Sequence, residues 1–263
     1  MEKKRIKKGR ILINEPITPE IFEMVLAVEN PGEASPGQFL NLYCKDGSRL
    51  LPRAISIGEV DRERGAFRLI YKVLGKGTHE FSTLEKDEEI QYLGPLGKGF
   101  TPEDGDGKSG EEEILIIGGG VGVPPLLELS KQLKGRKRVL LGFEKESILT
   151  EDFKKVATEV AVATTTGAEG IKGTVMDLLD RGEYAPKKIY SCGPKGMLKA
   201  VQAWGRARKI PMELSLEERM ACGIGACLVC TCKIQEGPHG EDWNYQRVCK
   251  DGPVFKGEEV VFE

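Results

Sequence analysis

The sequence predicts a multidomain fold of the β plus α/β class, with an antiparallel β-barrel, a parallel-sheet domain and a short C-terminal subdomain. Three observations lead to this prediction. Short apolar stretches separated by proline and glycine fill residues 1–101, strands alternate with helices over residues 112–215, and cysteines replace regular periodicity in residues 216–263. A chain of 263 residues is long enough to divide into such units.

Charge and hydropathy exclude several classes of protein. The net charge is −2, which gives no basis for binding nucleic acid or an anionic membrane. No stretch approaches the roughly 18 apolar residues of a membrane span, and the basic residues 1–10 are not followed by the apolar run of a signal peptide. We therefore expect a cytoplasmic protein, whose cysteines are reduced thiols or metal ligands rather than disulfides.

The first domain is predicted to be an antiparallel barrel or sandwich, because its apolar stretches are short and closely spaced. These stretches cover residues 22–28, 39–43, 67–73 and 89–93. Residues 102–113 follow and are polar, acidic and rich in glycine, which is typical of an exposed linker between domains.

The second domain is predicted to be a parallel sheet covered by helices on both faces, because strands and helices alternate. The expected strands are residues 114–117, 139–143, 160–164, 188–192 and a closing strand at 213–216. The expected helices begin at residue 124, cover residues 175–179 and run from about 194 to 208. The 47 residues that remain are few for an independent core, so this tail needs a staple.

Four cysteines of the tail are candidates for that staple. They are Cys222, Cys227, Cys230 and Cys249. Their spacing is C-x4-C-x2-C with a fourth cysteine after 18 more residues, which is the arrangement of plant-type [2Fe–2S] ligation. Gly223 and Gly225 permit the close backbone approach and positive φ that such a loop needs.

The alternative is a structural zinc site on the same four thiolates, although zinc sites more often use two C-x2-C pairs and only one is present here. Cys232, two residues beyond Cys230, is interpreted as a packing residue or a neighbour of the cluster. Cys44 is isolated in the first domain and is interpreted as a small buried apolar residue.

A glycine-rich turn at residues 118–122 follows a predicted strand and opens a predicted helix. Gly119, Gly120 and Gly122 would let a phosphate approach the helix N-terminus, where unpaired N–H groups attract anions. A tight turn without a ligand is the alternative. Glu144 lies about 20 residues further on, where an acid can bind the ribose hydroxyls of NAD, and Lys145 beside it leaves NADP open. For Glu144 the alternative is a solvated surface charge.

A second turn follows the last clear strand and consists of Cys192, Gly193 and Pro194. Ligands of open parallel sheets gather at the carboxyl ends of the strands, so we expect both turns at one edge of the sheet. The alternative for Cys192 is a reduced, partly buried thiol without a role.

The first domain carries candidate groups for an anionic, aromatic ligand. Arg53 offers a fork of donors suited to a pyrophosphate, and Gly77 and Thr78 offer an N–H and a hydroxyl. The ring of Tyr71 is a candidate to pack against an aromatic ring system. For Arg53 the alternative is a solvated charge on a strand edge.

Taken in order, these motifs resemble the ferredoxin–NADP reductase superfamily. The motifs are R-x-x-S at residues 53–56, G-x-G-T at 75–78, G-G-x-G-x-x-P at 119–125 and C-G-P at 192–194. In that superfamily a barrel binds flavin and an α/β domain binds a nicotinamide nucleotide. Residues 216–227 and 247–255 narrow the resemblance to the electron-transfer subunits of NAD-dependent (class 1B) dihydroorotate dehydrogenases, and it covers almost the whole chain.

The resemblance implies three groups of cofactor contacts. Contacts to FAD would come from Arg53, Ala54, Ile55, Ser56, Ile70, Tyr71, Lys72, Gly77 and Thr78. NAD(H) would bind at the two glycine-containing turns, and the four cysteines Cys222, Cys227, Cys230 and Cys249 would hold a [2Fe–2S] cluster. Ala54 departs from the family, in which proline is frequent at this position. The missing proline loosens the strand but removes no hydrogen-bond donor.

The implied function is electron transfer between NAD(H) and the FMN of a dihydroorotate dehydrogenase catalytic subunit, through FAD and the [2Fe–2S] cluster, in pyrimidine (UMP) biosynthesis. Its partner would be that catalytic subunit, in a heterotetramer of two copies of each. No catalytic nucleophile or base is expected from this chain, and His79 and His239 are interpreted as structural or exposed. The alternatives are a subunit of a flavin-based ferredoxin:NADP oxidoreductase and, in another class, a non-catalytic binding module stapled by zinc.

Overall fold

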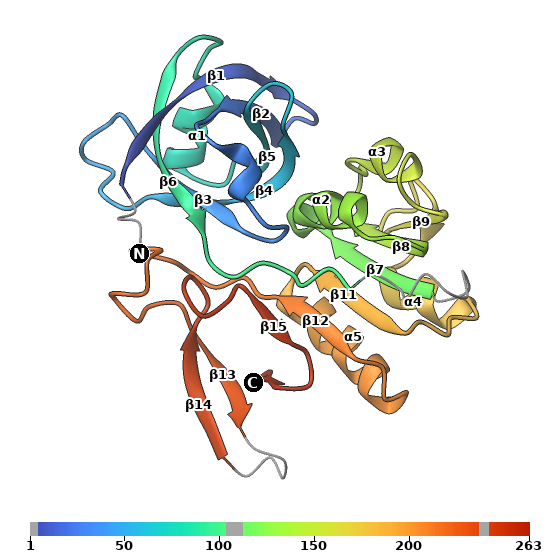
Figure 1. Cartoon of the computed structure of the whole chain (residues 1–263). Coiled ribbons are helices and arrows are strands. Elements are labelled where there is room, and N and C mark those ends of the chain that lie inside the picture. Colours follow the sequence, from blue (N-terminus) through green and yellow to red (C-terminus); the bar gives the residue numbers. More distant parts are fainter. Residues whose placement is uncertain (1–4, 104–112, 237–241) are drawn as a thin grey trace.

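In the computed structural model the chain forms a closed barrel, a large sheet with helices on both faces and a small three-stranded sheet (Figure 1). The structure describes residues 5–103, 113–236 and 242–263. Most of the linker predicted at residues 102–113 therefore lies outside the described residues. None of the described helices is long and apolar enough to cross a membrane.

The N-terminal barrel has six strands in the order β1-β2-β5-β4-β3-β6, and all its pairings are antiparallel. The strands are β1 (Lys7–Pro16), β2 (Ile21–Ala27), β3 (Phe39–Tyr43), β4 (Arg53–Asp61), β5 (Ala66–Lys72) and β6 (Glu89–Leu96). A 3-10 turn (η1, Pro31–Glu33) precedes β3, and a short helix (α1, Lys76–Ser82) places Phe81 in the barrel core. The predicted antiparallel barrel is confirmed.

The second domain is built on a seven-stranded sheet in the order β10-β9-β8-β7-β11-β12-β15. Its parallel strands are β7 (Glu113–Gly119), β8 (Arg136–Phe143), β9 (Glu159–Thr164), β10 (Ile171–Lys172), β11 (Lys188–Cys192) and β12 (Met212–Ser215). The predicted closing strand corresponds to β12, but β12 is not the edge. The short strand β15 (Val254–Lys256) pairs antiparallel with it, so the tail completes the sheet.

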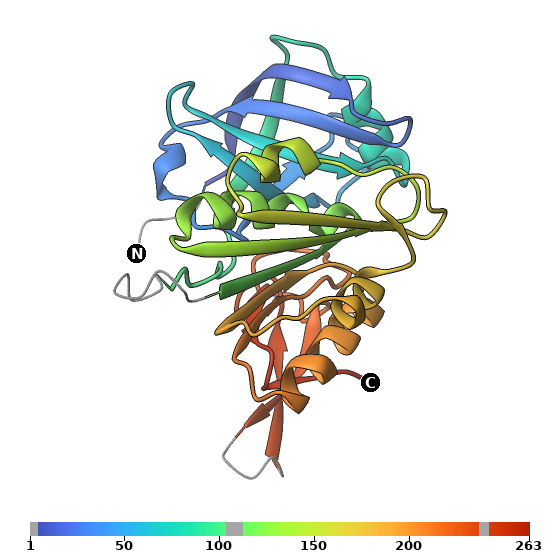
Figure 2. The same cartoon turned by 90° about the vertical axis from the view of Figure 1, so that its right-hand side faces the viewer.

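Helices cover both faces of this sheet, as predicted. On one face, α2 (Pro124–Gln132) and α3 (Thr150–Lys154) supply Leu126, Leu127 and Phe153 to one apolar core. On the other, α4 (Val175–Arg181) and α5 (Lys195–Ala207) pack into a second core. A 3-10 turn (η2, Gly120–Gly122) joins β7 to α2, and α2 lies between the sheet and the barrel (Figure 2).

The C-terminal segment forms a three-stranded sheet in the order β14-β13-β16. The strands are β13 (Thr231–Glu236), β14 (Asp242–Arg247) and β16 (Val260–Val261). Ile234 and Val260 are buried in the same core as α4 and α5, so the small sheet packs on the α/β domain. The cysteine loop, residues 222–230, precedes β13.

Candidate functional site

The two glycine-containing turns lie against each other at the carboxyl edge of the sheet. Strands β7 and β11 are parallel neighbours, and Cys192 lies opposite Gly118. A Cβ added at Gly122 would lie 2.6 Å from the Cα and 2.7 Å from the nitrogen of Gly193, which is backbone and cannot swing away. A Cβ at Gly119 would lie 2.6 Å from the sulfur of Met197. Glycine is therefore required where the turns meet.

An open cleft of about 740 Å³ extends from these turns toward the barrel. The ends of β7, β8 and β11 line one side, and the β1–β2 turn and the end of β5 line the other. The lining includes Gly119, Gly120, Gly122, Gly193, Pro194, Glu144, Lys145, Glu20 and Lys72. Its volume is within the range of small-molecule and cofactor sites. Gly120 has a φ of +52°, and among the described residues no atom lies within 4 Å of the position that a Cβ would take, so its backbone faces open space.

Cys192 is the member of the second turn that does not line the cleft. Its side chain is buried behind the turn, and burial raises the pKa of the thiol to about 12 despite a hydrogen bond with Ser215. The thiol therefore stays protonated at neutral pH. Of the predicted turn, only Gly193 and Pro194 face the cleft.

Two predicted flavin segments meet at the rim of the barrel. The guanidinium of Arg53, at the start of β4, lies directly on Gly77 of α1, and a methyl group there would overlap it. Arg53 also donates a hydrogen bond to the carbonyl of Leu51. The hydroxyl of Thr78 accepts the N–H of Leu74 at 3.0 Å and so orders the loop that enters α1. Two segments far apart in the sequence thus form one donor-rich surface.

The third flavin segment, at residues 70–72, is divided between interior and surface. Tyr71 is 2% exposed, its ring stacks on Phe22 at 5.9 Å and its hydroxyl donates to Asn14 at 2.9 Å. The expectation that this ring packs against a ligand is wrong for this structure, because the barrel core already holds it. Ile70 is also buried, whereas Lys72 reaches the cleft and pairs with Glu20 at 3.0 Å.

The remaining residues of the first segment lie along the same strand. Ile55 and Ser56 are half-buried and Ala54 is exposed, opposite Asn41 of β3. The side chain of Asn41 is buried and donates a hydrogen bond to the carbonyl of Cys222 at 3.1 Å. Neighbouring strands lie about 4.8 Å apart. The cysteine loop is therefore held one strand away from the predicted flavin strand.

Backbone N–H groups point at the sulfurs of the cysteine loop. Gly225 donates to Cys249 at 3.1 Å, and Ala226 donates to Cys222 at 3.3 Å. The nitrogen of Cys249 is also 3.4 Å from the sulfur of Cys230. Such N–H contacts are the interactions that stabilise thiolates and tune iron–sulfur centres.

Positive φ angles give the loop this shape. They are +64° at Gly223 and +82° at Gly225, as the sequence predicted, and +59° at Leu228, which no glycine or asparagine signalled. Arg247 braces the loop, since its guanidinium donates to the carbonyl of Gly225 at 3.1 Å and pairs with Asp251 at 2.8 Å. Neither Arg247 nor Asn41 was expected at the site.

The pKa values of the loop thiols are shifted by burial, by backbone N–H groups and by neighbouring thiols. Burial opposes ionisation of Cys222, but the N–H groups around it lower its pKa to about 6. Burial and the neighbouring Cys230 raise the pKa of Cys249. In the described part of the chain, no three ligand side chains converge on one point as around a single ion. A [2Fe–2S] cluster is held by four thiolates, and the four cysteines with the backbone N–H groups that face their sulfurs fit that group.

The two other cysteines pack against apolar residues. Cys232, on β13, is half-buried beside the α4–α5 core, and burial raises the pKa of its thiol to about 12. Cys44 is half-buried beside the barrel core, and burial raises its thiol pKa as well.

The chain is similar to known proteins over almost its whole length. Residues 217–261 match the family of the iron-sulfur cluster binding domain of dihydroorotate dehydrogenase B. The electron transfer subunits of dihydroorotate dehydrogenase B (NAD(+)) from Caldanaerobacter subterraneus subsp. tengcongensis and Bacillus cereus strain G9842 are 40% and 41% identical to it, over 97% of this chain and 98% of each relative.

A solved structure shares the same architecture. It is described as the NADH-dependent reduced ferredoxin-NADP oxidoreductase, in a study of flavin-based electron bifurcation. The match has a TM-score of 0.82 and 27% identity, and it covers 99% of this chain and 91% of the other.

Proposed function

Because this chain belongs to the family of dihydroorotate dehydrogenase B (NAD(+)) electron transfer subunits, we propose that it carries electrons between NAD(H) and the FMN of a dihydroorotate dehydrogenase catalytic subunit, in pyrimidine biosynthesis. The observation that carries the proposal is the hydrogen bond from Asn41 to the carbonyl of Cys222. It joins the cysteine loop to the strand next to the proposed flavin strand, so the two redox sites are neighbours.

Each cofactor has a place in this proposal. NAD(H) binds in the cleft, with its phosphates at the turn of Gly119, Gly120 and Gly122 and its ribose near Glu144. FAD lies at the barrel rim, with its pyrophosphate on Arg53 and Gly77. When bound, FAD accepts a hydride and a [2Fe–2S] cluster on the four cysteines carries single electrons.

The protein contributes binding and orientation. Lys72 joins the flavin segment to the cleft, because it ends β5 and lines the cleft beside Glu20. Backbone N–H groups from Gly225 and Ala226 favour the charged form of the sulfurs. We further propose residues 1–101, 112–215 and 216–263 as flavin, nucleotide and cluster units, a cytoplasmic location, and an assembly of two copies of each subunit.

The direct test is an assay with a catalytic partner. The purified chain is mixed with the FMN-containing subunit of a dihydroorotate dehydrogenase B, dihydroorotate and NAD⁺, and NADH is followed by its absorbance. NADH formation that needs both proteins supports the proposal. NADH formation that does not need this chain, or no coupling at all with both cofactors loaded, contradicts it.

The ferredoxin:NADP oxidoreductase alternative has one specific observation in its favour, the 27% identity over 99% of the chain. The 40% identity to the dihydroorotate dehydrogenase B subunits favours the first proposal. The two differ in partner, so reduction of ferredoxin without dihydroorotate coupling would support the alternative. The zinc-stapled module would be colourless and contain zinc instead of iron.

Gly77→Ala tests the flavin surface. The added methyl overlaps the guanidinium of Arg53 and displaces it, which removes a charge-assisted hydrogen bond to phosphate. Such a bond contributes about 1.5–3 kcal/mol, so we expect FAD to bind about 10–100-fold more weakly. Titration of the FAD-free protein with FAD, followed by flavin fluorescence, measures the change.

Gly75→Ala is the matched control. It lies two residues away, its φ is −158° and no described residue lies within 4 Å of the added methyl, so FAD affinity should stay at the wild-type value. Equal affinities for the two variants would show that Arg53 is not at the pyrophosphate.

A further inference from the structure

The two sides of the nucleotide cleft belong to different domains, so their alignment depends on the interface between barrel and sheet. The glycine turn opens α2, whereas two of the three flavin segments lie on β4 and β5. We infer that Arg68 and Glu128 are positioning residues that fix the nucleotide turn relative to the flavin strands. This inference rests on the proposed function and adds to it two residues that touch neither cofactor site.

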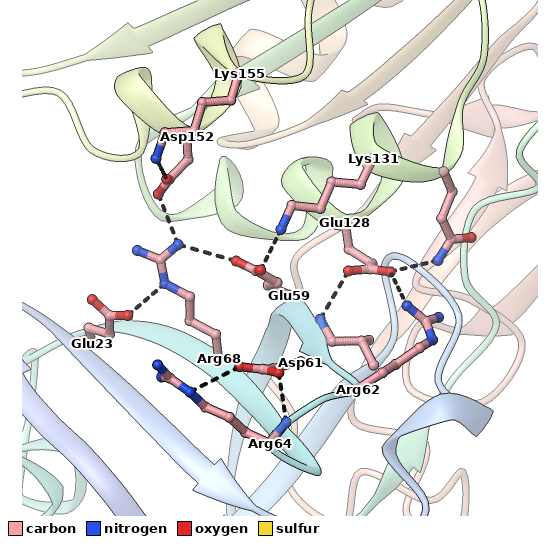
Figure 3. A network of polar contacts seen from close by, with 12 residues as sticks. Glu23, Glu59, Asp61, Arg62, Arg64, Arg68, Glu128, Lys131, Asp152 and Lys155 are labelled. Atoms are coloured by element: carbon pink, nitrogen blue, oxygen red, sulfur yellow. Dashed lines mark hydrogen bonds and ion pairs between the residues drawn. The ribbon is translucent and has the colours of Figure 1, made fainter.

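Arg68 connects the barrel to helix α3. It lies on β5, two residues before the flavin segment that begins at Ile70. Its guanidinium is 2.6 Å from a carboxylate oxygen of Glu23 and 2.9 Å from one of Asp152, and only 21% of the side chain is exposed (Figure 3). Glu23 belongs to the barrel and Asp152 to α3. One side chain thus joins the two domains through charge-assisted hydrogen bonds.

Glu128 connects helix α2 to the barrel. Its side chain is 2% exposed, and one carboxylate oxygen accepts the backbone N–H of Val60, on β4, at 2.9 Å. The other oxygen accepts from Gln132 of the same helix at 2.7 Å. Burial of a carboxylate costs free energy unless the carboxylate is hydrogen-bonded. Breaking the hydrogen bond to Val60 or the one to Gln132 is therefore disfavoured.

Further contacts join the barrel to helix α2 at the same interface (Figure 3). Glu59 of β4 pairs with Arg68 at 3.3 Å and with Lys131 of α2. Gly58 packs on Pro124, the first residue of α2, where an added Cβ would lie 3.1 Å from the proline Cβ. The start of α2 is therefore held on β4 two residues after the glycine turn.

This geometry matters because hydride transfer needs reacting atoms about 3–3.5 Å apart, and a misplacement of about 1 Å can lower a rate about 100-fold. Glu128 holds α2, which follows the glycine turn, on β4. Arg68 joins β5 to α3 directly and to α2 through Glu59 and Lys131. Loss of Arg68 or Glu128 should therefore alter the rate of transfer more than the affinity for either cofactor.

The test is anaerobic stopped-flow reduction of the loaded protein by NADH. Arg68→Met should lower the rate constant of flavin reduction at saturating NADH about 10–100-fold, with the dissociation constant for NADH changed less than about threefold. Its FAD and iron contents should match the wild type. Arg64→Met is the matched control, because Arg64 pairs with Asp61 at 3.6 Å within the same hairpin and does not reach the other domain. It should react at the wild-type rate.

Glu128 offers a test by conservative rescue. Glu128→Gln keeps an oxygen for the N–H of Val60, and the amide of Gln132 can turn to accept from the new amide, so the rate should stay within about threefold of wild type. Glu128→Leu removes the acceptor and should slow flavin reduction as Arg68→Met does. If Arg68 and Glu128 had only a structural role, Arg68→Met and Glu128→Leu would lower the unfolding midpoint and the cofactor content. The rate of flavin reduction in the loaded fraction would then be unchanged.

Two outcomes would overturn the inference, and they are distinguishable. If the wild type is reduced by NADH and Arg68→Met and Glu128→Leu react at the rate of Arg64→Met, the positioning role is wrong and the proposed function stands. If the loaded wild type is not reduced by NADH, the proposed function itself fails, and the positioning role fails with it.

Discussion

Cys249→Ser is expected to remove the [2Fe–2S] cluster while FAD binding is retained. Cys249 accepts the N–H of Gly225 and lies beside Cys230, at the centre of the hydrogen bonds that shape the loop. Its contacts to the barrel are indirect, since the loop meets β3 through the carbonyl of Cys222. The rim formed by Arg53 and Gly77 is left intact.

Iron content and electron transfer measure this effect. Iron should fall well below the roughly two atoms per chain of a binuclear cluster. Changing even an outer partner of a metal ligand costs about 10–100-fold in metal affinity or activity, so loss of a ligand should slow electron delivery to the catalytic subunit more than about 100-fold. Flavin absorbance and its reduction by NADH should remain.

Cys232→Ser is the matched control, because Cys232 lies two residues from Cys230 but packs beside the α4–α5 core. It should keep its iron. Loss of flavin together with the cluster in every ligand variant would contradict the separation of the two sites.

Gly122→Ala is expected to slow the reaction with NADH strongly without removing either redox cofactor. The added methyl would lie 2.6 Å from the Cα of Gly193, and the neighbour is backbone of the second turn. One of the two turns must then move by several tenths of an ångström or more. Because both turns line the cleft, the nucleotide phosphates lose their position.

We expect the rate of flavin reduction by NADH to fall about 10–100-fold, because a misplacement of about 1 Å lowers a rate about 100-fold. Anaerobic stopped-flow spectra measure it. Reduction by dithionite, which does not use the cleft, should be unchanged. Gly196→Ala is the control, since Gly196 lies on α5 and no described residue comes within 4 Å of an added Cβ. Wild-type rates for Gly122→Ala would exclude the glycine turn as the nucleotide site.

Local patterns predicted those parts of the fold whose elements have a signal of their own. The predicted strand at residues 188–192 coincides with β11, and the helix expected from about 194 to 208 is α5, Lys195–Ala207. The cysteine spacing and the two loop glycines predicted the loop and its positive φ angles, since only a few backbone shapes can wrap sulfurs. Strand β15 was not predicted because three residues are too few to show a period, and strands β1 and β14 were not predicted either.

The features that the sequence could not predict depend on tertiary contacts. An aromatic ring such as that of Tyr71 can pack against a ligand, but it can equally pack in a barrel core. Here Phe22 stacks on the ring of Tyr71. Asn41 gave no signal, because its role comes from a loop 181 residues away. In the sequence, nothing distinguishes Arg68 and Glu128 from other charged residues. They lie at an interface only because α2 and α3 pack against the barrel.

The most direct test of the central claim is the visible spectrum of the purified protein before and after anaerobic addition of NADH, with iron and flavin analysis of the same sample. The account predicts flavin bands overlaid on [2Fe–2S] absorption, and bleaching of both by NADH. A protein that shows neither chromophore after anaerobic reconstitution with FAD, iron and sulfide would contradict the account and favour the zinc-stapled binding module.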